Sequence, residues 1–235
     1  MKMGVDTKLV SQFFCCYTAE KTKIKIQQSA ISLIRKKTHS STNFIIFAGR
    51  IESPEMNTNE QFDHVICLCR ELFEKKLNDY GASWRIMRPQ SITDQIFIKA
   101  NRIRSLETKG TNLIDEGIKS EFIGIVNYGV IGLIQLELGY SDTVDISEKQ
   151  ALELYNKHIT ASKELMYAKN HDYDEAWRSM RISSYTDFIL TKIYRTKQIE
   201  SKEGKTLISE GVDANYMDMV NYALFGLIKL EYEQE

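Results

Sequence analysis

The sequence has only two prolines, Pro54 and Pro89, in 235 residues. Clusters of turn-forming residues are also scarce, so long stretches lack the residues that interrupt helices. Hydrophobic residues make up 43% of the chain, which is enough for a packed core. Helix is therefore the simplest expectation for most of the chain.

Cysteine is also rare: the four residues form two pairs, Cys15-Cys16 and Cys67-Leu68-Cys69. Neither pair has a second pair at zinc-ligand spacing, and neighbouring cysteines on a helix point to different faces. The pattern favours reduced thiols in a cytoplasmic protein. The sequence also lacks an HExxH motif, a glycine-rich phosphate loop and a recognised nucleophile motif. A hydrolase built from this sequence would therefore depend on a metal-activated water.

No uninterrupted hydrophobic run reaches the roughly 20 residues of a membrane-spanning helix. Residues 9–17 are too short for the apolar core of a secretory signal, and polar side chains break them. Residues 122–138 are apolar but are interrupted by Asn127 and Gln135. We expect this segment to be a buried helix, and we expect no membrane partner.

The chain as a whole has no large excess of positive or negative charge, since its formal net charge is −1. The first 56 residues carry nine Lys or Arg against four Asp or Glu, which leaves 22 basic and 28 acidic residues for the rest. An acidic body argues against tight binding to a nucleic-acid backbone, which needs a basic surface. Residues 1–56 are expected to be a basic leader, either disordered or an overextended start before Met56, and a genuine basic tail is the alternative.

One segment of the chain occurs twice. Residues 79–88 read DYGASWRIMR, and residues 172–181 read DYDEAWRSMR, 93 positions later. After one inserted residue the offset becomes 94, as in the VNY of 126–128 and of 220–222. A repeat of this size is large enough to be half of a pseudo-symmetric domain. We therefore predict a tandem duplication, with copy one at 57–147 and copy two at 148–235.

Apolar residues recur at helical spacing in three segments of each copy. The expected helices are 61–77, 91–107 and 121–137 in copy one, and 154–168, 184–200 and 215 to beyond 231 in copy two. Asp94 and Asp187 are expected near the start of the second helices, where an acid interacts favourably with a helix N-terminus. The predicted fold class is all-α, a helical bundle built from two tandem copies of a three-helix unit with a pseudo-two-fold axis. Gly132 and its twin Gly226 would permit close helix approach at the centre.

Acidic residues on and before the third helix are the candidate metal ligands. In copy two, Asn215, Asp218 and Tyr222 share one helix face and follow Glu210, whereas the equivalent face of copy one begins with Glu121. Oxygen ligands one helical turn apart can hold Mg²⁺ jointly with substrate phosphates. We predict a metal site formed by Glu121, Glu210 and Asp218. The alternative is that Glu121 and Asp218 only favour the first turn of their helices.

Cations on the second helix are the candidate phosphate ligands. They lie at i,i+3 spacing on one face in both copies: Lys99, Arg102, Lys192 and Arg195. Such a pair can clamp phosphate oxygens, and solvated surface charge is the alternative. We expect the acids of one helix and the cations of the other to surround a shared pocket.

Aromatic and amide side chains complete the predicted nucleotide pocket. They are Tyr80, Tyr173, Asn127 and Asn221. A tyrosine can either pack or stack on a base, while Trp84 and Trp177 are most simply anchors that hold the connection against the bundle. The arginines of the repeated segment are further phosphate candidates: Arg85, Arg88, Arg178 and Arg181.

A resemblance to the nucleotide modification associated domain 1 family is carried by three motifs. They are Lys76-x-x-Asp79-Tyr80-Gly81, Lys99-x-x-Arg102-Ile103, and Glu210 followed by Asp218-Met-Val-Asn-Tyr222. The resemblance covers about 60–233 and includes both copies. It implies a task connected with nucleotides or modified nucleotides.

A looser similarity is to the MazG-like all-α nucleoside triphosphate pyrophosphohydrolases, which bind Mg²⁺ through ExxE and ExxD motifs. The chain departs from that pattern, because Asn215 stands in place of the Glu in copy two and Gly124 in place of the Asp in copy one. We expect a cytoplasmic nucleotide-handling protein, with Mg²⁺-dependent pyrophosphohydrolysis of nucleoside triphosphates as the leading reaction. The alternative is a non-catalytic module that binds a nucleotide or a partner protein, and a homo-oligomer is compatible with either function.

Overall fold

The chain divides into two units, residues 1–53 and residues 54–235. The computed structural model describes residues 56–110, 117–205 and 210–233, all of which belong to the second unit. The predictions for the basic leader therefore fall outside the described residues, apart from Met56.

Each copy consists of three long helices and one short 3-10 helix. Copy one contains α2 (Thr58–Tyr80), η1 (Ser83–Ile86), α3 (Pro89–Lys109) and α4 (Ile118–Leu138). Copy two contains α5 (Glu148–Tyr173), η2 (Ala176–Ser179), α6 (Ile182–Glu200) and α7 (Val212–Tyr232). The described residues form no strand, so the predicted all-α fold with three principal helices per copy is confirmed.

Capping boxes fix where the first helix of each copy begins. In α2 the side chain of Asn57 accepts from the backbone of Glu60, whose carboxylate in turn accepts from the backbone of Asn57. Ser147 and Gln150 make the same exchange at the start of α5. Each box satisfies two backbone N–H groups that the first turn would otherwise leave unpaired.

The second helices begin earlier than the sequence pattern predicts. Helix α3 starts at Pro89 after the extended residue Arg88, and no side chain caps it. Asp94 therefore lies in the second turn of α3, and the prediction that Asp94 and its equivalent Asp187 act at helix N-termini is wrong. Asp94 instead forms an ion pair with Lys197 at 2.6 Å.

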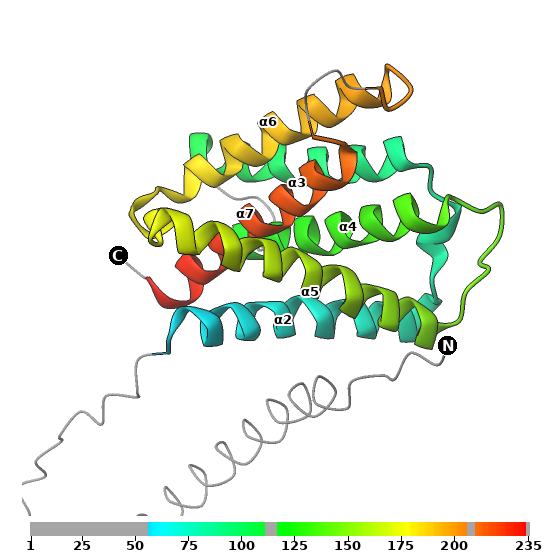
Figure 1. Ribbon diagram of the computed structural model, residues 1–235, viewed down its shortest axis with the longest axis horizontal. Helices are drawn as coiled ribbons and strands as arrows, with labels where there is room; N and C mark the ends of the chain where they lie inside the picture. Colours follow the sequence, from blue (N-terminus) through cyan, green and yellow to red (C-terminus); the bar gives the residue numbers. More distant parts are fainter. Residues whose placement is uncertain (1–55, 111–116, 206–209, 234–235) are drawn as a thin grey trace, which may run out of the picture. The chain divides into compact units, whose positions relative to one another are not determined.

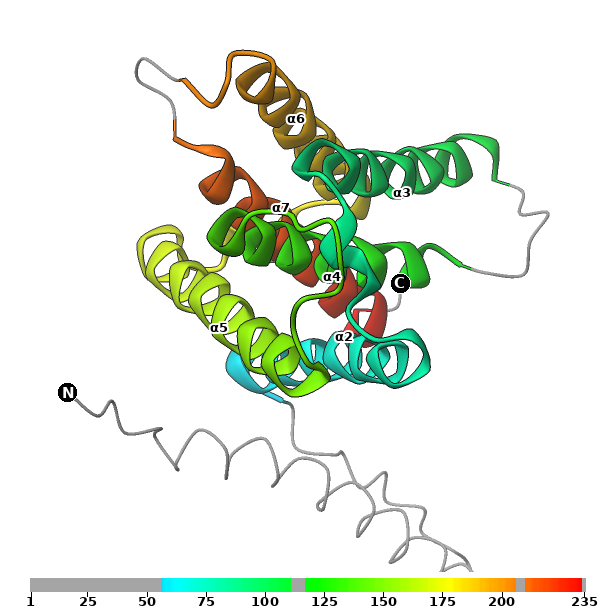
Figure 2. The same cartoon turned by 90° about the vertical axis from the view of Figure 1, so that its right-hand side faces the viewer.

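The six long helices form three layers, visible in both ribbon views (Figures 1 and 2). Helices α4 and α7 make up the middle layer, α3 and α6 lie on one side of it, and α2 and α5 lie on the other. Helix α4 packs against α7, and α3 packs against α6, so both of these pairs join the two copies. The core is shared between the copies rather than divided between them.

Two glycines permit the close approach of α4 and α7. A Cβ atom on Gly132 would lie 2.7 Å from Cε1 of Tyr216, and one on Gly226 would lie 2.9 Å from Cζ of Phe122. Each glycine thus receives an aromatic ring from the other copy, as the pseudo-two-fold axis requires. The predicted role of both glycines is confirmed.

Helix α4 is the one described helix that is long and apolar enough to cross a membrane by length and composition alone. Two thirds of its most apolar window, 67%, is buried inside the protein. Its apolar side chains are therefore used largely as core, in contact with α7 and α3.

The contact between α3 and α6 contains two equivalent hydrogen bonds, one from each helix to the other. The hydroxyl of Thr93 donates to Glu200 at 2.8 Å, and the hydroxyl of Thr186 donates to Glu107 at 3.1 Å. Thr93 and Thr186, like Glu107 and Glu200, are 93 positions apart. This reciprocity is direct evidence of a pseudo-two-fold axis between the copies.

The repeated DYxxxWRxMR segment contains the 3-10 helix. Its backbone carbonyls accept hydrogen bonds from a side chain of the third helix. In copy one, the amide of Gln135 donates to the carbonyls of Arg85 and Met87 at 3.1 and 2.7 Å. In copy two the ammonium of Lys229, at the equivalent position, donates to the carbonyls of Arg178 and Met180 at 2.7 and 2.9 Å. A neutral amide and a charged amine thus close the same turn.

Arg85 is a buried structural residue, with an exposed fraction of 2%. Its guanidinium forms a bidentate pair with Asp145, at 2.7 and 3.0 Å, and donates to the carbonyl of Gly139 and to Gln135. The expectation that Arg85 binds phosphate is therefore wrong. Trp84 and Trp177 are 7% and 5% exposed, which confirms them as anchors.

Candidate functional site

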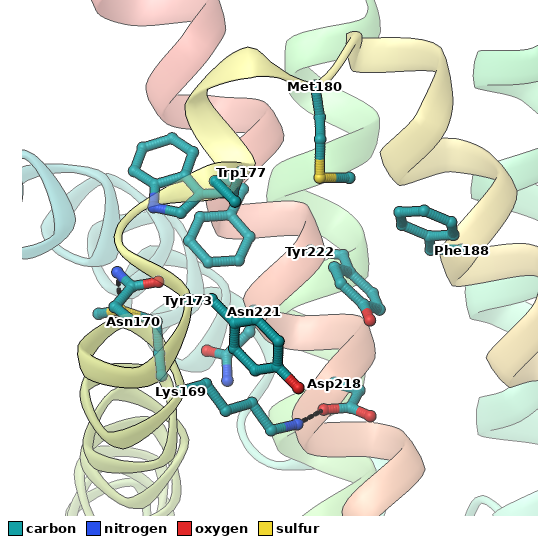
Figure 3. A pocket seen from close by; sticks show the side chains of 12 residues that line it. Lys169, Asn170, Tyr173, Trp177, Met180, Phe188, Asp218, Asn221 and Tyr222 are labelled. Atoms are coloured by element: carbon teal, nitrogen blue, oxygen red, sulfur yellow. Dashed lines mark hydrogen bonds and ion pairs between the residues drawn. The ribbon is translucent and has the colours of Figure 1, made fainter.

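Two pockets lie at equivalent places in the two copies. The copy-one pocket, with a volume of about 540 Å³, is bounded by the end of α2, by η1 and by α4. The copy-two pocket, of about 340 Å³, is bounded by the end of α5, by η2 and by α7 (Figure 3). Their shared lining consists of equivalent pairs: Lys76 and Lys169, Tyr80 and Tyr173, Trp84 and Trp177, Asn127 and Asn221, Tyr128 and Tyr222.

In the copy-one pocket, a carboxylate in the first turn of α4 holds two cations of α3. Glu121 is only 6% exposed. Nζ of Lys99 lies 3.4 Å from one of its oxygens, and the guanidinium of Arg102 contacts the other. The Lys99 side chain crosses directly over Gly124, where an added Cβ would lie 2.6 Å from its Cε. The absence of a side chain at Gly124 is what makes room for Lys99.

In the copy-two pocket the carboxylate has moved one turn along the helix. Asp218 occupies the position equivalent to Gly124 and is also 6% exposed. Lys192 of α6 lies 2.5 Å from Oδ2, and Lys169 of α5 donates to Oδ1 at 2.6 Å, as Figure 3 shows for the second pair. One buried carboxylate therefore holds two lysines from two different helices.

The charges at the mouth of the copy-two pocket affect one another. Burial opposes the charge of Lys169, but the hydrogen bond to Asp218, its negative charge and that of Glu210 outweigh this effect, so the pKa of Lys169 is raised. Burial, together with the charge of Asp218, raises the pKa of Tyr222. Lys169 is therefore a firmly charged ammonium beside a neutral phenol.

The buried amides of the two pockets differ in their partners. Asn127 donates to the carbonyl of Cys69 at 3.1 Å, and its Oδ1 accepts a hydrogen bond of 2.8 Å from the hydroxyl of Tyr155. Asn221 likewise donates to the carbonyl of Ser162, at 2.9 Å, but its Oδ1 is buried with no hydrogen-bond partner. The residue equivalent to Tyr155 is Phe62, which has no hydroxyl to donate.

Comparison with known families identifies the repeated unit. A family model described as nucleotide modification associated domain 1 matches residues 76–136 and 169–230, more than half of the chain. The chain belongs to the nucleotide modification associated domain 1 family. A search of curated proteins and a search of solved structures each found no match. The looser similarity to MazG-like enzymes is not shown by these comparisons.

The matched segments coincide with the pockets. Each begins at the pocket lysine, Lys76 or Lys169, and continues through most of the third helix of its copy. The family unit therefore includes the lysine, the 3-10 helix, the second helix and the third helix. Phe62 and Tyr155, which set the state of the buried amides, lie outside the matched segments.

The structure groups most of the predicted site residues, but by copy. Copy one brings together Tyr80, Lys99, Glu121 and Asn127 around its pocket, with Arg102 bound to Glu121. Copy two brings together Tyr173, Asp218 and Asn221, with Lys192 bound to Asp218. Arg195 is exposed on α6, close enough to Tyr222 to act on its pKa. The expectation of one shared pocket is wrong, because Glu121 and Asp218 line different pockets.

The acids of the third helices hold cations. Among residues 56–110, 117–205 and 210–233, no three His, Cys, Asp or Glu side chains are grouped so that they could hold a metal ion. Both oxygens of Asp218, and both oxygens of Glu121, already contact a lysine or an arginine. As arranged, these carboxylates do not fit a protein-only metal site, and the predicted metal ligation remains a prediction.

One pocket residue was not foreseen. Lys169 was not predicted as a site residue, although it binds Asp218 in the pocket. The signal was present in the repeat, since Lys169 is 93 positions after Lys76.

Proposed function

We propose that this protein binds nucleotides or modified nucleotides through the pockets of its two copies. Membership of the nucleotide modification associated domain 1 family supports a role in nucleotide metabolism. The observation that carries the proposal is the copy-two arrangement, in which Lys169 and Asp218 line one pocket with the rings of Tyr173 and Tyr222, and Lys192 pairs with Asp218. Lysine binds phosphate as a point charge, and an aromatic ring can stack on a base.

The charge of this arrangement favours an anion. Lys169 and Lys192 share the single carboxylate of Asp218, which leaves one positive charge uncompensated in the triad. Arg195, exposed on the same helix as Lys192, makes no ion pair with any residue in the described part of the chain and adds a positive charge near Tyr222, where Glu210 adds a negative one, so the group stays net positive. The net positive charge of these side chains, beside low-dielectric walls, attracts a phosphate group.

Calorimetric titration with the four deoxynucleoside triphosphates tests the proposal. We expect Lys192→Gln to weaken nucleotide binding about ten-fold or more, because a charge-assisted hydrogen bond contributes roughly 1.5–3 kcal/mol. Lys75→Gln is the matched control, since Lys75 is exposed on α2, lines neither pocket and pairs with Glu71 rather than with a pocket carboxylate. Failure of the parent protein to bind any nucleotide, or equal binding by parent and Lys192→Gln, would contradict the proposal.

A second candidate is Mg²⁺-dependent release of pyrophosphate from nucleoside triphosphates. One observation favours it: Asp218 binds Lys169 in the pocket, and Glu210 lies near enough to contribute to the raised pKa of Lys169. Mg²⁺ is often held by one or two carboxylates and completed by substrate phosphates. Incubation with nucleotides and Mg²⁺ should then release pyrophosphate, and Asp218→Asn should abolish the release. Nucleotide binding without pyrophosphate would reject the enzyme and leave the binding function.

A further inference from the structure

The copy-one pocket contains a lysine that has no acidic partner. Lys76, near the end of α2, lines this pocket and is exposed. Its ammonium forms no ion pair or hydrogen bond with any residue that the structure describes. The equivalent lysine of copy two, Lys169, donates to Asp218 at 2.6 Å. The same lysine is therefore paired in one copy and available in the other.

The position of the acid on the third helix explains this difference. Copy one has Gly124 where copy two has Asp218, so this turn of α4 presents no carboxylate to Lys76. The acid of copy one, Glu121, lies one turn earlier, and both of its oxygens contact cations of α3. The charge of Lys76 therefore remains available to an anionic group of a ligand.

The size and the lining of the copy-one pocket suit a nucleotide. The pocket has a volume of about 540 Å³, against about 340 Å³ in copy two. Two lining positions carry smaller side chains, with Gly124 and Ile131 in place of Asp218 and Phe225. Tyr80 is 56% exposed and lies one helical turn after Lys76 on the same face of α2. A base that stacks on Tyr80 can therefore place its phosphate at the lysine.

We propose that Lys76 binds the phosphate of a nucleotide in the copy-one pocket, and that this pocket is the tighter of the two. The inference rests on the proposed nucleotide binding and assigns a phosphate ligand on α2, outside the cations of α3 and α6. In copy two a phosphate shares Lys169 with Asp218, whose negative charge opposes it. Each chain therefore has two nucleotide sites of unequal affinity.

Calorimetric titration of the full chain with dATP tests the inference. Lys76→Gln should weaken the tighter site by about five-fold, since the lysine is exposed and its charge is partly screened. The neighbouring Lys75→Gln, which leaves both pockets unaltered, should have no effect.

Substitution of Gly124 supplies the second variant. Gly124→Asp gives copy one the carboxylate of copy two, so it should pair with Lys76 and remove the advantage of the tighter site. Gly124→Asn adds a side chain of the same size without the charge. Both displace the Lys99 side chain in the same way, so the aspartate should weaken dATP binding more than the asparagine does.

The outcomes separate this inference from the proposed function. Equal affinity of the two sites in the parent overturns the inference and leaves nucleotide binding intact. So does a tighter site, or a single detectable site, that Lys76→Gln leaves unchanged. Equal weakening by Gly124→Asp and Gly124→Asn also overturns it, because the effect would then come from bulk. Melting curves establish that each variant is folded, and Lys76→Gln decides if the Gly124 variants are not. Absence of all nucleotide binding overturns both proposals.

Discussion

At the scale of single residues, the two copies differ most where they carry charge. The acid is Glu121 in copy one, but in copy two that position is Asn215, whose side chain donates to the carbonyl of Gly211 at 2.7 Å. Copy two has its acid one turn later, at Asp218, where copy one has Gly124. Both acids are buried and bind the equivalent lysine of the second helix, Lys99 or Lys192. The equivalent lysine is thus paired with a buried carboxylate in both copies, although that carboxylate lies at a different position of the third helix in each copy.

Arg85 provides a test of buried charge at the residue scale. We expect Arg85→Ala to lower the free energy of unfolding by roughly 3 kcal/mol, because it leaves the Gln135 amide and the Gly139 carbonyl without their donor. Arg178→Ala is the matched variant in copy two, where the side chain is 30% exposed and its partners can be hydrated. Urea unfolding of both variants gives the comparison, and a smaller loss for Arg85→Ala than for Arg178→Ala would contradict the assignment.

The sequence indicated several of the residues that line the two pockets, but not the partners of those residues. Helical periodicity indicates which residues share a face, and so it placed Asp218 with Tyr222 and Lys99 with Arg102. It does not indicate which neighbouring helix covers that face. The contact between Asp218 and Lys169 joins α7 to the end of α5, and no spacing rule connects those two segments. The separation into two pockets could not be predicted for the same reason.

At the scale of elements, the contact between α3 and α6 is sensitive to pH. Burial raises the pKa of Glu107 and of Glu200, although the hydrogen bonds from Thr186 and Thr93 partly oppose this effect. A raised pKa means that the folded state binds the proton more tightly than the unfolded state. Stability from these carboxyls is therefore full below the unfolded pKa of about 4.3, and is lost as the pH rises through the folded pKa.

Substitution of both carboxyls tests this dependence. The variant Glu107→Gln with Glu200→Gln keeps an oxygen that accepts from each threonine, and it cannot ionise. We expect it to be more stable than the parent at pH 7 and to lose most of that advantage at pH 4. Urea midpoints across this range provide the measurement, with Glu153→Gln on the exposed face of α5 as the control. An advantage that does not change with pH would show that ionisation is not its cause.

The α4–α7 contact depends on a missing side chain. Gly132→Ala should destabilise the protein by about 1–3 kcal/mol, since its Cβ would meet the ring of Tyr216 in a packed core. Gly124→Ala is the control on the same helix, because its Cβ would meet only the flexible Lys99 side chain. That change should be close to neutral, with the helix propensity of alanine offsetting the displacement. Thermal unfolding of the two variants checks the order.

Element boundaries also show what the sequence could and could not specify. The predicted helices are real, but α2 and α5 extend beyond the apolar stretches to capping boxes at Asn57 and Ser147. For α3 the Ser/Thr-rich stretch at residue 91 indicated a start, whereas the helix begins at Pro89, whose fixed φ suits the first helical position. Serine and threonine occur both as helix caps and within the first turn of a helix. Their presence in the sequence therefore could not show whether residue 91 precedes the helix or lies inside it.

At the scale of the whole molecule, neither copy has a core of its own. The pairs α4 and α7, α3 and α6, and α2 and α5 all join one copy to the other. We expect a fragment of residues 56–146 to show no cooperative unfolding as a monomer, because its α4 would expose the apolar face that α7 covers. Circular dichroism and light scattering provide the measurement, with an equimolar mixture with residues 147–235 as the positive control. A stable folded monomer would contradict this prediction.

The covalent link between the copies has a consequence for how the pockets can change. In a dimer of identical chains every substitution enters both subunits, so the two ligand sites must remain alike. Here Gly124 and Asp218 can differ while the reciprocal threonine and glutamate contacts of α3 and α6 stay the same. One half of the molecule is therefore free to acquire a new ligand preference while the other half keeps its own, and both continue to fold as a single unit.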